Sequence, residues 1–111
     1  MKRKFEMYLK DIKYPTKEEK KEMWDVSGIL KQKSNEHLKF DIRPMFKLKT
    51  GQVAKKGTFN TKADKIVFEA EEEYIVTDMQ ELINYVKNNK LKTVPLEDIV
   101  EKLEWNLILK K

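Results

Sequence analysis

The sequence of residues 37–49 reads HLKFDIRPMFKLK and carries the strongest secondary-structure signal in the chain. Apolar side chains occupy every second position from Leu38 to Ile42, with charged residues between them, and this period of two is typical of a half-buried β-strand. Pro44 interrupts the strand because proline has no N–H to donate to a sheet. The alternation resumes at 46–48, so the sequence predicts an interrupted strand at the centre of a sheet-based fold.

Other segments predict further strands on either side of this one. The predicted strands are 5–9, 25–33, 66–68, 74–76 and 105–109. The evidence for each is either a period of two or a run of β-branched and aromatic residues. Over 25–33, a strand with a bulge at Gly28 is favoured over the alternative, a continuation of the preceding helix. Residues 51–63 contain two of the three glycines and read as an exposed loop or a flexible hairpin.

Three segments carry helix signals. Asp78 with Glu81 forms a capping box that opens a helix over 78–89. Thr93 is the expected N-cap of a helix over 95–104, in which apolar residues follow helical spacing. Thr16 with Glu19 opens a short peripheral helix over 16–24.

These elements predict one α+β domain spanning residues 1–111, because strands dominate early and helices follow late. We expect a curved antiparallel sheet of about five strands, covered by the helices at 78–89 and 95–104. The predicted core residues are Phe40, Ile42, Phe68, Ile75, Leu82, Val86, Ile99, Leu103, Trp105 and Leu107.

Composition excludes several classes of protein. The chain has 111 residues, no cysteine and a single histidine, so disulfide frameworks, thiolate nucleophiles and multi-histidine metal sites are excluded within one chain. The basic start is not followed by an apolar segment, and no run approaches the ~18 residues of a membrane helix. We therefore expect a cytoplasmic protein with no membrane contact. Its richness in Lys, Glu, Asn and Ile is typical of an AT-rich bacterium, a phage or a mobile element.

Catalytic motifs are also missing from the sequence. No glycine-rich phosphate loop is present, and neither Ser27 nor Ser34 lies in a nucleophile elbow that His37 could serve. Carboxylates such as Glu69 and Glu71 could bind Mg²⁺ for a nuclease, but accidental pairs are expected among 19 acidic residues. We expect no enzyme activity and no cofactor or metal.

The charge is unevenly distributed along the chain. Residues 1–65 contain 18 Lys and Arg against 9 Asp and Glu, a net charge of +9, whereas residues 66–111 contain 6 against 10, a net charge of −4. The most basic stretch is 45–65, where Asp64 is the single acid. Such asymmetry favours a polyanionic partner, although lysine-rich strands also prevent edge-to-edge pairing.

The basic stretch predicts a nucleic-acid site because it combines lysines for phosphates with aromatic rings for base stacking. The predicted binding residues are Lys47, Lys49, Lys55, Lys56, Phe59, Lys62 and Lys65. Phe59 stands in a polar loop, so the alternative is that it anchors the loop in the core. Tyr8 and Tyr14 are near the basic N-terminus and could join the same surface.

The favoured hypothesis is a non-enzymatic accessory protein that binds nucleic acid, with single strands as the form suited to stacking. The alternative is a small protein-interaction module that inhibits or adapts a host enzyme through its charged surface, without contacting nucleic acid. The sequence leaves the oligomeric state open.

Overall fold

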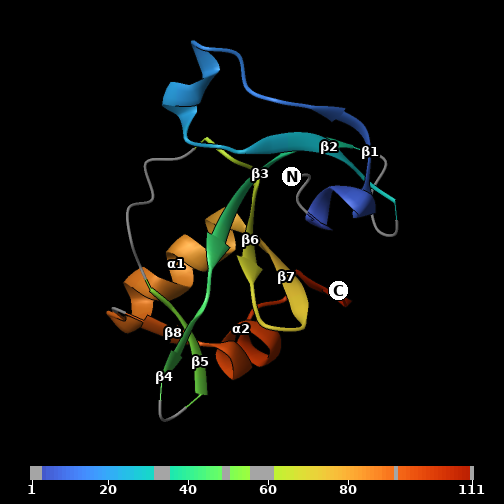
Figure 1. Ribbon diagram of the computed structural model, residues 1–111. Coiled ribbons are helices and arrows are strands. Elements are labelled where there is room, and N and C mark those ends of the chain that lie inside the picture. Colours follow the sequence, from blue (N-terminus) through green and yellow to red (C-terminus); the bar gives the residue numbers. More distant parts are fainter. Residues whose placement is uncertain (1–3, 32–35, 49–50, 56–61, 92, 111) are drawn as a thin grey trace.

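Nine strands, two α-helices and two short 3-10 helices make up the part of the chain that the structure describes (Figure 1). The computed structural model describes residues 4–31, 36–48, 51–55, 62–91 and 93–110, with the backbone alone at Lys4, 46–48, 51–55 and Leu96. The α+β class predicted from the sequence is confirmed.

The larger sheet has six strands in the order β1-β2-β3-β6-β7-β9. Their bounds are β1 Leu9–Lys13, β2 Val26–Leu30, β3 His37–Pro44, β6 Lys65–Glu69, β7 Glu73–Asp78 and β9 Asn106–Lys110. Neighbouring strands are antiparallel except for β3 and β6, which run parallel with Phe40 opposite Lys65. The sheet is therefore mixed, and the prediction of about five antiparallel strands is wrong in count and in orientation.

The parallel pair arises because the chain leaves the large sheet after β3. It forms β4 (Phe46–Leu48) and β5 (Gly51–Lys55), which build a second sheet with β8 (Thr93–Pro95) in the order β4-β5-β8. A parallel pair needs a crossover of a dozen or more residues, and this excursion supplies it. Residues 51–63, which the sequence predicts to be an exposed loop or a flexible hairpin, therefore begin with β5, a strand that pairs with β4.

The bounds of helices α1 (Met79–Asn89) and α2 (Leu96–Lys102) are close to those predicted, 78–89 and 95–104. The Asp78 side chain accepts a hydrogen bond from Glu81 N at 3.0 Å, as the capping box predicts. The N-cap predicted at Thr93 is wrong, because Thr93 begins β8 and Pro95 is the residue that precedes α2.

Strands β6 and β7 are buried on both faces. One core contacts α1 and α2 and contains Ile66, Phe68, Ala70, Ile75, Met79, Leu82, Val86, Val94, Ile99, Leu103, Trp24 and Ala63. The other lies inside the curl of the sheet and contains Phe5, Leu9, Val26, Leu30, Leu38, Phe40, Val67, Tyr74, Val76 and Leu109. Strands buried on both faces are continuously apolar, which explains the unbroken runs 66–68 and 74–76. Of the predicted core residues, Ile42, Trp105 and Leu107 are only partly buried.

The N-terminal segment differs from its prediction. Residues 4–8 form the 3-10 helix η1 (Lys4–Tyr8), and the strand begins only at Leu9. Phe5 and Leu9 are both buried, whereas Met7 between them is 64% exposed. The structure thus buries Phe5 in the second core, where its ring makes edge contacts with Phe40 at 5.3 Å and Tyr74 at 5.6 Å.

The peripheral helix predicted over 16–24 is reduced to the 3-10 helix η2 (Glu19–Glu22). Its capping box is present, because Thr16 N and Glu19 N each donate to the other residue's side chain at 3.2 Å. Figure 1 shows η2 with β1 and β2 at one end of the molecule and the α-helices at the other.

A bulge does occur beside Gly28, but on the neighbouring strand. Lys10 pairs with Ile29 and Lys13 with Ser27, so Asp11 and Ile12 together lie opposite Gly28. A Cβ added to Gly28 would lie 3.1 Å from the Lys10 carbonyl oxygen. Glycine therefore permits the close approach of the bulged strand.

Candidate nucleic-acid interface

The structure describes four of the seven predicted binding residues, and these four lie in two different parts of the fold. Lys47 and Lys55 belong to β4 and β5 of the small sheet, where only the backbone is described. Lys65 is the first residue of β6 in the large sheet, and Lys62 lies in the segment just before that strand. The remaining three, Lys49, Lys56 and Phe59, are outside the described residues.

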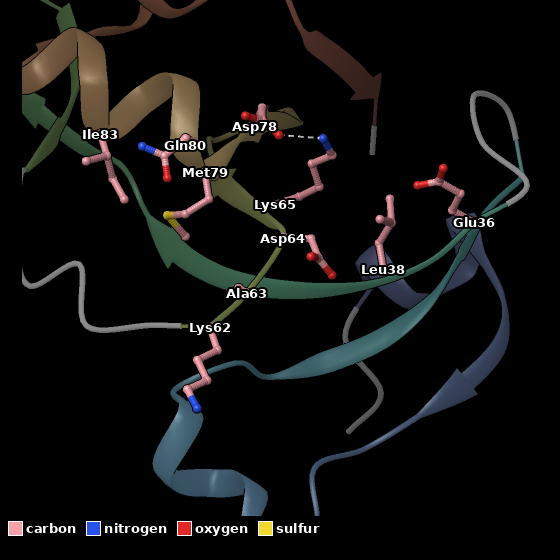
Figure 2. Close-up of a pocket in the computed structure, with 10 residues that line it drawn as sticks. All are labelled: Glu36, Leu38, Lys62, Ala63, Asp64, Lys65, Asp78, Met79, Gln80 and Ile83. Carbon is pink, nitrogen blue, oxygen red and sulfur yellow. Dashed lines mark hydrogen bonds and ion pairs between the residues drawn. The ribbon is translucent and has the colours of Figure 1, made fainter.

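Lys65 forms an ion pair within the fold. Its Nζ lies 2.7 Å from Asp78 Oδ1 and 4.0 Å from the centre of the Trp105 ring, and its side chain is 13% exposed (Figure 2). Burial favours the neutral form of Asp78, but the hydrogen bonds from Lys65 and from Glu81 N outweigh it and lower the pKa of the carboxyl group. The charge of Lys65 thus holds β6 to the start of α1.

The pocket beside Lys65 does not suit a phosphate. It encloses about 400 Å³ between the starts of β3, β6 and α1, and Figure 2 shows the ten residues that line it. Three of them are the acids Glu36, Asp64 and Asp78, which outnumber Lys62 and Lys65. An anion would therefore meet more negative than positive charge there.

Lys62 lies next to a second lysine-containing segment that is distant in the sequence, residues 17–22, which read KEEKKE and hold as many glutamates as lysines. Its backbone N–H donates to the Glu22 carbonyl oxygen at 2.8 Å, which joins the start of β6 to η2. The exposed lysines of this region are Lys17, Lys20, Lys21 and Lys62. We call these four residues the η2 patch.

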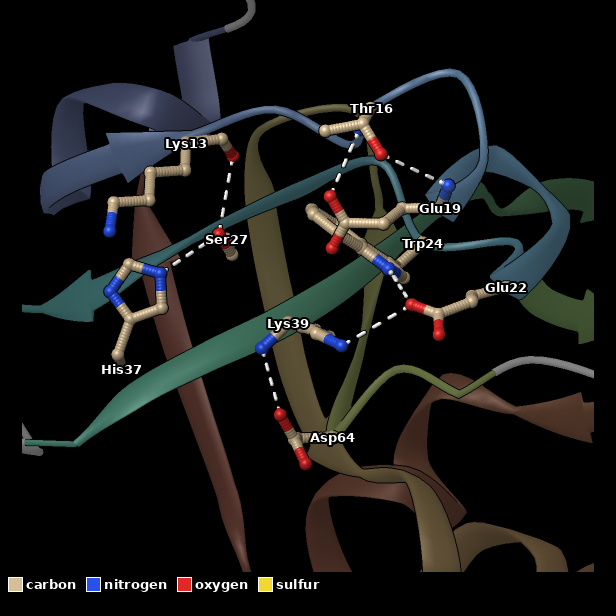
Figure 3. Close-up of polar contacts among 9 residues, drawn as sticks. All are labelled: Lys13, Thr16, Glu19, Glu22, Trp24, Ser27, His37, Lys39 and Asp64. Carbon is tan, nitrogen blue, oxygen red and sulfur yellow. Dashed lines mark hydrogen bonds and ion pairs between the residues drawn. The ribbon is translucent and has the colours of Figure 1, made fainter.

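Four acids around the η2 patch, Glu19, Glu22, Asp25 and Asp64, make hydrogen bonds within the fold, and Glu18 is exposed between Lys17 and Lys20. Glu22 Oε1 accepts from Trp24 Nε1 at 2.8 Å and from Lys39 Nζ at 3.3 Å (Figure 3). These two bonds, that of Trp24 first, lower the pKa of Glu22. Asp64 Oδ2 accepts from Lys39 N at 2.9 Å, and Asp25 Oδ2 accepts from Ile42 N at 2.7 Å. These carboxylates are oriented by the fold, whereas the lysines of the patch are exposed.

A groove of about 570 Å³ lies beside the patch. We call it the Tyr14 groove, and its lining residues are Tyr14, Pro15, Lys20, Met23, Trp24 and Asp25. Tyr14 is 58% exposed and Met23 is 54% exposed, so two large apolar side chains are open to solvent. The Tyr14 hydroxyl donates to Glu6, and this hydrogen bond raises the pKa of the phenol.

The two tyrosines singled out from the sequence have different surroundings. Tyr8 is half-buried, donates to the Lys110 carbonyl oxygen and packs edge-on against Tyr74, so it closes the inner core. Tyr14 has an exposed ring beside lysines. No pattern in the sequence marks Met23 as exposed, because its exposure depends on the left-handed turn that ends η2.

His37 does contact a serine and an aspartate. Its Nε2 lies 2.9 Å from Ser27 Oγ, and its Nδ1 lies 3.5 Å from Asp11 Oδ2. The order matches that of a serine-hydrolase triad, but Ser27 is 3% exposed and its hydroxyl donates to the Lys13 carbonyl oxygen at 3.3 Å (Figure 3). In this arrangement the three side chains connect β1, β2 and β3.

The described part of the chain contains neither a group of metal-binding residues nor a membrane-spanning helix. Its His, Asp and Glu residues form no group of three or more that could hold a metal ion. Among its helices, none has the length and apolar character needed to cross a membrane.

Comparisons with known proteins identify no relative. No protein-family model, no curated protein and no solved structure matches the chain.

Proposed function

We propose that this is a cytoplasmic, non-enzymatic protein that binds single-stranded nucleic acid, with the η2 patch as part of its binding surface. The observation that carries the proposal is the hydrogen bond from Lys62 N to the Glu22 carbonyl oxygen. It unites lysines of residues 17–21 with the end of the basic stretch 45–65, which the sequence separates by about forty residues.

The arrangement of the opposite charges supports this surface. The acidic residues Glu71 and Glu72 lie in the turn that follows β6, whereas Lys62 precedes that strand. A five-residue strand is roughly 16 Å long, which is beyond the Debye length of about 8 Å at physiological salt. The acidic turn therefore does not reach the η2 patch, and the acids close to its lysines are Glu18, Glu19 and Glu22 of the same segment.

The proposal predicts salt-sensitive binding that depends on the patch. In a fluorescence-anisotropy titration, a labelled 20-nucleotide single strand should bind with a dissociation constant near 1 μM at low salt. Each phosphate contact contributes about −0.7 to the slope of log K against log salt. The triple substitution Lys20→Gln, Lys21→Gln and Lys62→Gln should therefore flatten the slope by about 2 and weaken binding more than ten-fold.

A matched control removes the same charge elsewhere. Lys87, Lys102 and Lys110 are exposed on α1, α2 and β9, and their replacement by glutamine should leave the slope nearly unchanged. Equal loss in the two triple variants would mean that net charge alone matters and would contradict a localised surface. Absence of binding by the unmodified protein would end the proposal.

The alternative, a protein-interaction module, is favoured by one observation. β9 is the last strand of the large sheet, and its Ile108 is 39% exposed, as a strand that accepts a partner's strand would be. Affinity purification from nuclease-treated lysate tests it. A stoichiometric partner retained by the unmodified protein and lost on Ile108→Glu substitution would support this function in place of the first.

A further inference from the structure

The Tyr14 ring is a fixed aromatic surface open to solvent. Glu6 is buried and accepts the hydrogen bond of the Tyr14 hydroxyl, which holds the far end of the ring. The ring itself remains 58% exposed. A ring that is already immobilised loses little conformational freedom when a flat ligand stacks on it. This is the property required of a base-stacking residue.

Met23 adds a second exposed apolar side chain to the groove. Its backbone has φ 70° because it ends η2 in the left-handed conformation, as Lys90 ends α1. This turn leaves the side chain 54% exposed at the groove. Its polarisable thioether can make favourable contacts with an aromatic ring.

The remaining walls of the groove define the chemistry of its ligand. Trp24 is 4% exposed and its indole N–H is held by Glu22, so it forms a rigid apolar wall. Lys20 supplies a cation at the groove, and Asp25 supplies one carboxylate, whose Oδ2 accepts a hydrogen bond from Ile42 N. Lys17 and Lys21 are exposed nearby in the sequence. The volume of about 570 Å³ falls within the range typical of small-ligand sites. Apolar aromatic walls beside a cation suit a flat base that carries a phosphate.

We propose that the Tyr14 groove binds one unpaired base of a single-stranded nucleic acid, stacked on Tyr14 and in contact with Met23, while Lys20 binds the adjacent phosphate. This inference rests on the proposed function and adds the recognition of the base to it. Duplexes should bind more weakly because their bases are already stacked on one another.

The two tryptophans provide a direct reporter. Trp105 contacts Lys65 and does not line the groove, and the Trp105→Phe protein retains Trp24 as its single tryptophan. We would titrate this protein with oligo(dT) and with an abasic strand of the same length, which has the phosphates but no bases. Oligo(dT) should quench Trp24 and bind at least five-fold more tightly than the abasic strand.

Further substitutions in the Trp105→Phe protein distinguish the contribution of base stacking to affinity from that of charge. Tyr14→Ala should weaken oligo(dT) binding about 5- to 150-fold, which corresponds to one stacked base, with little effect on the abasic strand. Tyr14→Phe keeps the ring and should retain most of the preference for oligo(dT). Ile108→Ala removes an exposed apolar side chain on β9 and serves as the control that changes neither affinity.

Met23→Gly provides a variant that is expected to fold, because glycine adopts the left-handed conformation of this position without strain. Glycine relieves the left-handed backbone, so the melting temperature should rise while the preference for oligo(dT) over the abasic strand falls. A merely structural role for Met23 would leave that preference unchanged.

The outcomes distinguish the inference from the proposed function. Salt-sensitive binding with equal affinity for oligo(dT) and the abasic strand, or a preference that survives Tyr14→Ala, would overturn the base-binding groove and leave the proposed function standing. Absence of binding to both strands would overturn the two together. Binding of a protein partner that Tyr14→Ala abolishes, without any oligonucleotide binding, would assign the groove to a protein ligand and also overturn the inference.

Discussion

Replacing Phe5 with alanine is expected to lower the free energy of unfolding by about 3–5 kcal/mol, the range measured for large aromatic residues in cores. Phe5 is fully buried and contacts the rings of Phe40 and Tyr74. Its removal would leave a cavity inside the curled sheet that the surrounding strands fill only in part. Because small domains are stable by about 5–15 kcal/mol, this loss would be a large fraction of the total.

Urea denaturation followed by circular dichroism measures this effect, and Met7→Ala is the control from the same 3-10 helix. Met7 is 64% exposed, so its truncation should change the stability by less than about 0.5 kcal/mol. Equal effects of the two substitutions would show that η1 does not fill the inner core.

The pair formed by Lys65 and Asp78 is expected to give the second large effect. Asp78→Ala removes both the N-cap of α1 and the partner of a lysine that is 13% exposed, so we expect a loss of about 2–4 kcal/mol. Asp78→Asn retains a residue able to cap the helix and should lose about 1 kcal/mol less. Lys65→Met combined with Asp78→Asn should recover part of the loss, because no unpaired charge then remains.

The same pair makes stability depend on pH. The pKa of Asp78 is lowered in the folded protein, so its contribution is present above the unfolded pKa of about 3.9 and is lost as pH falls through the folded value. Denaturation midpoints between pH 3 and pH 7 should therefore fall less steeply for Asp78→Asn than for the unmodified protein. Parallel curves would contradict the ion pair.

Local patterns in the sequence predicted most of the elements but not their arrangement. The alternation at Leu38–Ile42 and the capping box at Asp78 each produce the element expected, because neighbours along the chain determine them. The parallel pairing of β3 with β6 depends on where the chain returns after β5, which no local pattern records. The alternation over 5–9 predicts a strand, but the spacing of Phe5 and Leu9 also fits one turn of a helix. The structure forms the 3-10 helix η1 there.

In the candidate site, too, the sequence shows which residues are present but not how the fold brings them together. The lysines of the basic stretch were visible in the sequence, but the pairing of Lys65 with Asp78 depends on the register of β6 against β7. The contact of Lys62 with Glu22 likewise depends on tertiary structure. Tyr14 was noted for its position, whereas the anchoring of its ring by Glu6 requires η1 to lie beside it.

The most direct test of the account is to map the binding surface residue by residue. Backbone amide signals of the ¹⁵N-labelled protein would be followed by NMR during titration with oligo(dT). We predict that the largest shifts within the described residues fall in 14–25 and at Lys62, with α1 and α2 nearly unaffected. Shifts centred on α1, α2 or β9, or no shifts at low salt, would contradict the claim that the fold unites Lys62 with the lysines of residues 17–21 into a surface for single strands.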